Sequence, residues 1–279
     1  MANKGLRTSI VILFVAVILL PASAFAQASL GNGLKPHKAL YKIKMTSKKS
    51  GTQILNISGE MFYEWKPDCD AWITDHRFNL FYEYADNPAV AITTDFSTYE
   101  TFDGKNFEFS ALRKRDGEIF EELRGNATMS DDGGTVTFKT PEGLNFPLSK
   151  GTAFPMMHTL KMLEKAQNGS SFYTQTIFDG SDSEGPILVN SFIGKPINAM
   201  AVIKPSKNLD ANLYNTPARK VRMAFFPLNT EDPSSEYEID LIFHENGIIS
   251  DMLVEYHDFT VSQKLIALES IAEPSCEAE

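Results

Sequence analysis

Alternation of apolar and polar residues with a period of two dominates this chain. The apolar positions of three clear stretches are Ala39, Tyr41, Ile43 and Met45; Leu55, Ile57, Met61, Tyr63 and Trp65; and Tyr237, Ile239, Leu241 and Phe243. Side chains two residues apart on a strand point to the same face, so the pattern predicts strands with one face toward a core. The chain is therefore expected to be mainly β.

Turn signals separate the predicted strands. They are the dipeptides Asp103-Gly104, Asp116-Gly117, Asp132-Gly133 and Asn246-Gly247. Such pairs supply the positive φ angles that tight hairpins require. Hairpin thus follows hairpin, and no Pro/Gly/Ser-rich linker divides the chain. We expect one continuous, curved antiparallel sheet.

Residues 152–168 have the period of a helix instead. Thr152 is expected to cap the first turn, and Pro155 suits a first helical position. Asn168-Gly169 is a termination signal. The apolar positions at helical spacing are Met156, Leu160 and Leu163. This one main amphipathic helix is expected to pack inside the curved sheet or across it.

The N-terminus has the layout of a secretory signal peptide. Lys4 and Arg7 precede an unbroken apolar run at residues 10–20, and Ala24-Phe25-Ala26 has the small-x-small form of a cleavage site. A run of 11 apolar residues is too short for a membrane-spanning helix, which needs about 20. We expect a signal peptide at residues 1–26 and one exported domain at residues 27–279 that is not an integral membrane protein.

The charge balance is acidic. The whole chain carries a net charge of −10, and loss of Lys4 and Arg7 with the signal would make it −12. An acidic surface argues against binding to nucleic acid and against simple electrostatic docking on anionic lipid.

The chain has two cysteines, Cys69 and Cys276. Disulfides persist outside the reducing cytosol, and neither cysteine lies in a CxxC pair or at zinc-ligand spacing from a histidine. Catalysis by Cys69 would need a base such as His76, and no sequence feature places one against it. A Cys69–Cys276 disulfide is therefore preferred over a metal site, a nucleophile or two buried thiols.

Catalytic motifs are missing from the sequence. HExxH, GxSxG, GxGxxG and the phosphate-binding loop do not occur. His158, early in the predicted helix, is a conceivable base, but a hydrogen-bonded structural histidine is the favoured interpretation. Residues 178–182 (FDGSD) are rich in acceptor oxygens, but the rest of a calcium loop is missing, so a turn after a strand is preferred. The sequence predicts no enzyme, no cofactor and no metal site.

Four longer blocks resemble one known family. They are GTAFPMMHTLKMLEKAQNGSSFYTQTIFDGSD at 151–182, HKALYKI at 37–43, SGEMFYEWKPDCDAW at 58–72, and ENGIISDMLVEYHDFTVSQKLIALESIAEPSC at 245–276. Together they make essentially the whole mature chain similar to the periplasmic cell-envelope integrity protein EipB family.

This resemblance implies a fold, a cellular location and a general role. Members of the family are exported proteins of Gram-negative bacteria, built as an antiparallel sheet that curls into an open spiral barrel. A disulfide between an early and a terminal cysteine is a family feature, and it carries over to Cys69 and Cys276. The family is linked to envelope integrity under stress, together with a periplasmic tetratricopeptide-repeat protein. It has no established catalytic residue to transfer.

We therefore expect a periplasmic, non-catalytic protein that supports cell-envelope integrity by binding another envelope protein, through an exposed strand edge or the open barrel mouth. The alternative is a carrier or sensor of a lipid or lipoprotein acyl chain, held on an apolar inner face. The candidate ligand or partner face consists of Phe154, Met156, Met157, His158, Leu160 and Leu163. A Met-rich face can line an adaptable groove, although simple core packing is its preferred interpretation.

Overall fold

The computed structural model describes residues 33–201, 203, 206–228, 232–272, 274 and 276. The expected signal peptide and its cleavage site lie outside these residues. The strands are β1 (His37–Lys48), β2 (Ile54–Pro67), β3 (Ala71–Tyr84), β4 (Val90–Thr101), β5 (Asn106–Arg115), β6 (Glu118–Ser130), β7 (Gly133–Thr140), β8 (Asn145–Leu148), β9 (Phe172–Ile177), β10 (Ile187–Ile197), β11 (Ala218–Pro227), β12 (Tyr237–His244), β13 (Ile249–Tyr256) and β14 (Phe259–Ser270). The helices are α2 (Pro155–Gln167), the short α3 (Ala211–Tyr214) and the 3-10 turn η1 (Ala199–Ala201).

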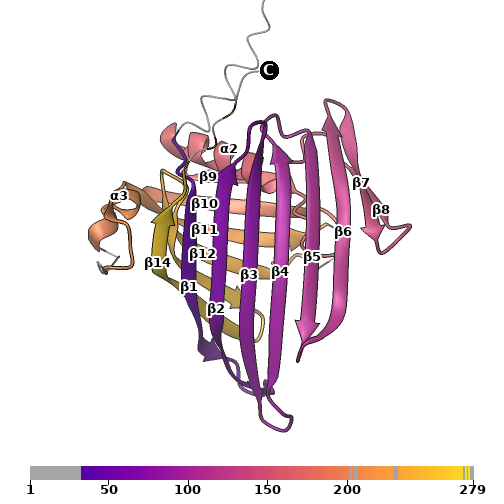
Figure 1. Ribbon diagram of the computed structural model, residues 1–279, viewed down its shortest axis with the longest axis vertical. Helices are drawn as coiled ribbons and strands as arrows, with labels where there is room; N and C mark the ends of the chain where they lie inside the picture. The colour runs from indigo at the N-terminus through magenta and orange to yellow at the C-terminus, as the bar shows by residue number, and fades with distance from the viewer. Residues whose placement is uncertain are drawn as a thin grey trace, which may run out of the picture.

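The 14 strands form one antiparallel sheet in the order β8-β7-β6-β5-β4-β3-β2-β1-β14-β13-β12-β11-β10-β9. Strands that follow each other along the chain therefore pair at every step except β8 to β9, which lie at the two edges. Strands β9–β14 run behind β1–β8 and across them (Figure 1), because β1 pairs with β14 where the sheet turns over. The predicted mainly β fold, an antiparallel sheet curled into an open barrel, is confirmed.

Aromatic packing, instead of a strand ladder, fills the gap between β8 and β9. Ala153, just before α2, accepts from the Phe178 N–H (3.0 Å) and donates to the Thr176 carbonyl (2.9 Å). The ring of Phe154 stacks on Phe107 in β5 at 4.9 Å, and Phe178 meets the edge of the same ring at 6.2 Å. Leu148 of β8 belongs to the same buried cluster as Phe154 and Phe178, so a few buried side chains hold the two sheet edges together.

Most of the positions predicted to face the core do so. Ala39, Tyr41, Ile43, Ile57, Met61, Trp65, Leu241 and Phe243 are buried. The prediction for Leu55 was wrong, because its side chain is 47% exposed. Between Ile54 and Asn56, β2 has one residue more than β3. Such an extra residue interrupts the alternation of side chains between the two faces of the sheet, so Leu55 faces outward.

The helix begins later than predicted, and its cap comes from elsewhere. Thr152 does not cap it, because its hydroxyl donates to the Ser149 carbonyl (2.8 Å) and the N-cap position is Phe154, with Pro155 next. The N–H groups of Met156 and Met157 donate instead to the Glu100 carboxylate of β4, each at 2.7 Å. The helix ends at Asn168-Gly169 as predicted.

The predicted disulfide is present. It joins Cys69, in the turn between β2 and β3, to Cys276, beyond the end of β14, over a sequence separation of 207 residues. Because β14, β1 and β2 are neighbours in the sheet, the bond ties the tail of the chain to its first hairpins. No helix among the described residues is long and apolar enough to cross a membrane.

Candidate functional site

The outer face of strands β10–β13 carries a groove with a volume of about 740 Å³. On these strands Val221, Leu241 and Met252 are buried, so the residues that alternate with them face outward. The outward-facing side chains of the groove are Phe192, Lys220, Arg222, Asp240, Ile242, Asp251 and Leu253. Gly194 adds no side chain at its edge. Across neighbouring strands Phe192 pairs with Arg222, and Leu253 pairs with Asp240. Apolar and charged side chains therefore alternate on the surface of the groove.

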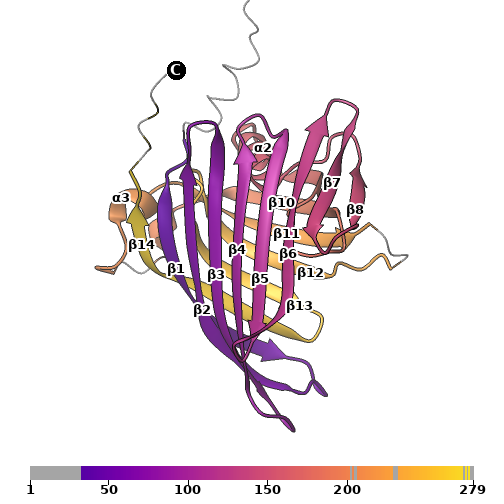
Figure 2. The same cartoon turned by 45° about the vertical axis from the view of Figure 1, so that its right-hand side comes forward.

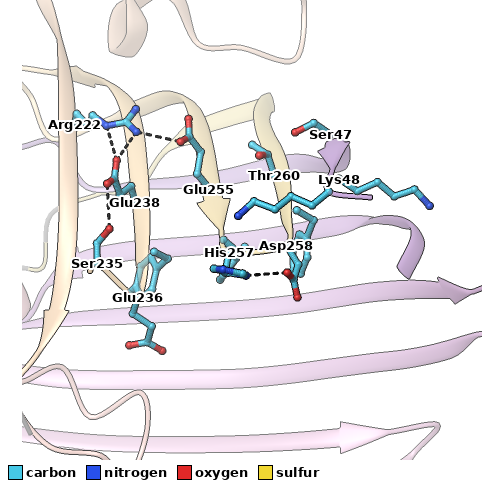
Figure 3. Close-up of a pocket in the computed structure, with 14 residues that line it drawn as sticks. Ser47, Lys48, Arg222, Ser235, Glu236, Glu238, Glu255, His257, Asp258 and Thr260 are labelled. Atoms are coloured by element: carbon cyan, nitrogen blue, oxygen red, sulfur yellow. Dashed lines mark hydrogen bonds and ion pairs between the residues drawn. The ribbon is translucent and has the colours of Figure 1, made fainter. Parts of the chain in front are cut away.

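A second hollow of about 380 Å³ meets the first at Arg222. Its labelled lining residues in Figure 3 are Ser47, Lys48, Arg222, Ser235, Glu236, Glu238, Glu255, His257, Asp258 and Thr260. We call the two hollows together the outer groove. Strands β10–β14 and the end of β1 contribute to it, so only the curled sheet assembles it.

One arginine organises the charges of the outer groove. Arg222 donates through Nε to Glu238 (2.7 Å), through Nη1 to Asp240 (2.6 Å) and through Nη2 to Glu255 (3.0 Å), as Figure 3 shows for the two glutamates. Each of these side chains is at least 30% exposed, so the ion pairs add little to stability individually. Three carboxylates around one guanidinium leave an excess of negative charge, which suits a partner with a basic side chain.

The predicted helix face is packed into the protein core. Phe154, Met156, His158, Leu160 and Leu163 are each at most 8% exposed, and Met157 is half-buried. The structure brings Met156, Leu160 and Leu163 into one core cluster. It does not join the other three to them on one face, since Phe154 belongs to a second core cluster, His158 lies against Tyr173 of β9 and Met157 lies against Gly104. The role of these six residues as a ligand or partner face stays a prediction.

His158 is held by stacking. Its ring lies 5.6 Å from the ring of Tyr173, and Nε2 has no hydrogen-bond partner among the described residues. Burial, with a smaller contribution from the nearby Lys161, lowers the pKa of His158 to about 4. The imidazole is therefore neutral at pH 7. The prediction of a hydrogen-bonded histidine was wrong, because Nε2 has no partner in the described part of the chain.

A serine–histidine contact escaped the sequence analysis. His244 Nε2 lies 2.9 Å from the Ser250 hydroxyl, and Nδ1 lies 3.1 Å from the Thr216 hydroxyl. His244 is fully buried and Ser250 is 6% exposed, so a substrate has no approach to this pair. Burial also lowers the pKa of His244 to about 4. No motif links the three residues, which form a satisfied internal network.

The FDGSD stretch forms a turn after β9, as predicted. The Asp179 carboxylate accepts the Ser181 N–H at 2.9 Å, which is the geometry of an Asx turn. Among the residues that the structure describes, no three His, Cys, Asp or Glu side chains are grouped so as to hold a metal ion.

Glu100 is a buried carboxylate that sequence reasoning missed. It is 1% exposed, and burial raises its pKa from the ordinary 4.5 to about 8, against the lowering effect of the two N–H bonds from α2. A folded state with the higher pKa binds more protons than the unfolded state between these two values. The contribution of Glu100 to the free energy of unfolding therefore falls as the pH rises from about 4.5 to 8.

Glu100→Gln tests this sign, because glutamine resembles the protonated acid. We expect the free energy of unfolding of the wild type to fall relative to that of the variant as the pH rises from 5 to 8, by up to about 1.4 kcal/mol per pH unit. Denaturant unfolding of both proteins across this range measures it. A wild type that gains stability over the variant with rising pH would show that the two N–H bonds outweigh burial.

The inner face of the sheet is not fully covered. Phe78, Leu80 and Tyr82 of β3 lie opposite Met61, Gly59 and Ile57 of β2 on this face. The inward-facing side chains that remain half-buried include Tyr63, Phe78, Leu80, Tyr82, Met223 and Ile239. Apolar surface thus stays accessible inside the curl.

Comparison with known proteins gives a consistent result. The family model described as EipB-like matches residues 28–272. The protein named "Cell envelope integrity protein EipB" from Brucella abortus (strain 2308) is 28% identical over 247 residues, which cover 88% of this chain and 87% of that protein. The crystal structure of a β-barrel-like protein, a domain of unknown function from Brucella abortus, aligns with a TM-score of 0.79 and 28% identity, covering 86% of this chain and 99% of that one.

Proposed function

Because the chain belongs to the EipB-like family, we propose that it is a periplasmic, non-catalytic protein that supports cell-envelope integrity by binding another envelope protein in the outer groove. The relative from Brucella abortus carries cell-envelope integrity in its name, and the alignment spans 87% of that relative. The observation that carries the proposal is the groove of about 740 Å³ on the outer face of β10–β13.

The chemistry of the groove suits a protein partner. Phe192, Ile242 and Leu253 supply apolar contact area, and the carboxylates around Arg222 favour a partner segment with a lysine or arginine. Interfaces of this kind place an apolar centre inside a polar rim. A periplasmic tetratricopeptide-repeat protein is the proposed partner.

Two further features support a periplasmic location and a non-catalytic role. The disulfide between Cys69 and Cys276 suits an oxidising compartment. The serine–histidine pair found in the protein is buried, and EipB-like proteins are not a known enzyme family.

A pair of matched variants tests partner binding. Ile242→Arg replaces an apolar contact residue of the groove by a charged one, whereas Leu112→Arg changes another half-buried outward-facing residue, on β5. In a strain that lacks the protein, we expect Leu112→Arg to restore growth on a detergent that stresses the envelope and Ile242→Arg to fail, with both variants folded by circular dichroism. A crosslinker placed at Ile242 should yield a protein adduct. Equal rescue by both variants would contradict the groove proposal.

The second candidate function is a carrier or sensor of a lipid or lipoprotein acyl chain. The half-buried apolar side chains of the inner face, such as Phe78 and Met223, favour it. Native mass spectrometry of protein recovered from its own periplasm, followed by lipid extraction, separates the two functions. An empty protein is expected under partner binding, and a stoichiometric acyl-chain ligand would establish the carrier.

A further inference from the structure

Exposed apolar side chains gather at one end of the curled sheet. They are Leu55 (47%), Phe81 (45%), Ile119 (59%), Phe120 (49%) and Tyr256 (44%). The hairpin ends β1–β2, β3–β4 and β5–β6 all project at this end, away from α2 (Figures 1 and 2). We call these five residues the hairpin rim. Leu55, Phe81, Ile119 and Phe120 belong to no core cluster, and Tyr256 lies against the rings of Tyr237 and Phe259 at 5.9 and 4.9 Å.

Main-chain contacts join part of the rim across three strands. Phe81 pairs directly with Ala91 of β4, which is itself exposed. Ala91 donates to the Asp116 carboxylate and accepts from the Asp116 N–H, both at 2.8 Å. The β3–β4 and β5–β6 ends therefore lie side by side, and Ile119 and Phe120 follow immediately after the β5–β6 turn.

The rim continues on its other side through the end of β1. The Lys49 N–H donates to the Asp258 carbonyl at 2.8 Å, so the β1–β2 turn touches the β13–β14 turn that follows Tyr256. Leu55 projects from β2 just after the same β1–β2 turn. Its exposure comes from the register shift between β2 and β3. The rim is thus a connected set of hairpin ends, each with an apolar side chain.

We infer that the hairpin rim docks this protein on the surface of a phospholipid bilayer by shallow insertion of its apolar side chains. The apolar groups project from separate hairpin ends, which suits insertion among lipid headgroups. The Arg115 guanidinium lies over the Phe120 ring, 5.2 Å from its centroid. An arginine beside an inserting aromatic ring keeps its charge at the headgroup level.

The charge of the rim permits this contact in an otherwise acidic protein. Residues 46–59 contain Lys48 and Lys49 and no Asp or Glu, although the chain as a whole has a net charge of −10. The β3–β4 and β5–β6 ends add Asp86, Asp116 and Glu118, so the attraction to anionic lipid is small. Insertion of apolar area supplies most of the affinity. The larger hollow of the outer groove, on β10–β13, stays free for a partner, whereas the smaller hollow shares Tyr256 with the rim.

Flotation with vesicles tests the inference on the full mature protein. Vesicles of phosphatidylethanolamine with a minority of phosphatidylglycerol are expected to carry the wild type upward in a density gradient. Ile119→Ser combined with Phe120→Ser should reduce the bound fraction about tenfold, because two inserting side chains are lost. Phe172→Ser combined with Met200→Ser is the matched control, since both side chains are more than 40% exposed on β9 and η1, outside the rim and the outer groove, and it should bind like the wild type.

A second readout does not depend on binding strength alone. In Phe120→Trp, the new indole is expected to shift its emission to the blue when vesicles are added, while Trp65 and Trp72 are buried and stay constant. Binding that persists in the rim variant, or that high salt abolishes, would overturn insertion. No vesicle binding, together with a crosslink from position 120 to an envelope protein, would assign the rim to a protein partner instead.

Discussion

Replacing Cys276 with serine is expected to lower the free energy of unfolding by about 4 kcal/mol in oxidising buffer. The disulfide to Cys69 spans 207 residues, and closing so long a loop restricts the unfolded chain. The chain-entropy model gives roughly 5 kcal/mol for a loop of this length, which residual structure in the unfolded state reduces.

The folded sheet should survive this change. Strands β1 and β14 remain paired from His37 and Ser270 onward, so removal of the bond releases only the tail beyond β14. Denaturant unfolding with and without reductant measures the effect. The double variant Cys69→Ser, Cys276→Ser is expected to have the same free energy of unfolding as the single variant, and reductant should not change it. A wild-type midpoint that reductant leaves unchanged would contradict a stabilising role for the bond.

Phe178→Ala is expected to lower the free energy of unfolding by about 3–5 kcal/mol, because it opens a cavity in a packed core. Phe178 is 1% exposed and contacts the rings of Phe107, Phe109 and Phe138. It follows β9 and packs against strands of the other half of the sheet, so it holds the unpaired edges together.

The control is Phe172→Ala at the other end of β9. Phe172 is 47% exposed, so its loss should cost less than about 1 kcal/mol. Hydrogen exchange supplies a second measurement: in Phe178→Ala, amides of β8 and β9 should exchange faster, while those of β1 and β14 stay protected. Equal losses of stability in the two variants would contradict a closing role for Phe178.

The turn that follows Phe178 also packs closely against the other half of the sheet. Gly180 has a φ of +69°, a conformation that glycine adopts readily, and a Cβ there would overlap the ring of Phe109. Arg113 of β5 also donates to the Ser181 carbonyl and pairs with Glu121 of β6. The FDGSD turn thus joins the two halves of the sheet through both apolar and polar contacts.

The sequence by itself determined the features that depend on neighbouring residues. Period-two alternation placed Tyr41 and Leu241 in the core, Asp-Gly and Asn-Gly pairs marked hairpin turns, and Asn168-Gly169 marked the end of α2. Local dihedral preferences and strand periodicity govern these features, so a single strand or turn carries the information. The two cysteines also pointed to their disulfide, because the predicted signal peptide implied an oxidising compartment.

Tertiary structure alone decided the features that join distant residues. A register shift turned Leu55 outward, and Glu100 took over the capping role expected of Thr152, 56 residues along the chain from Met156. The outer groove gathers Arg222 and three carboxylates from three strands, and the hairpin rim needs turns that are far apart in sequence. These outcomes depend on register, sheet curvature and the pairing of β1 with β14, and no local pattern encodes how distant strands align.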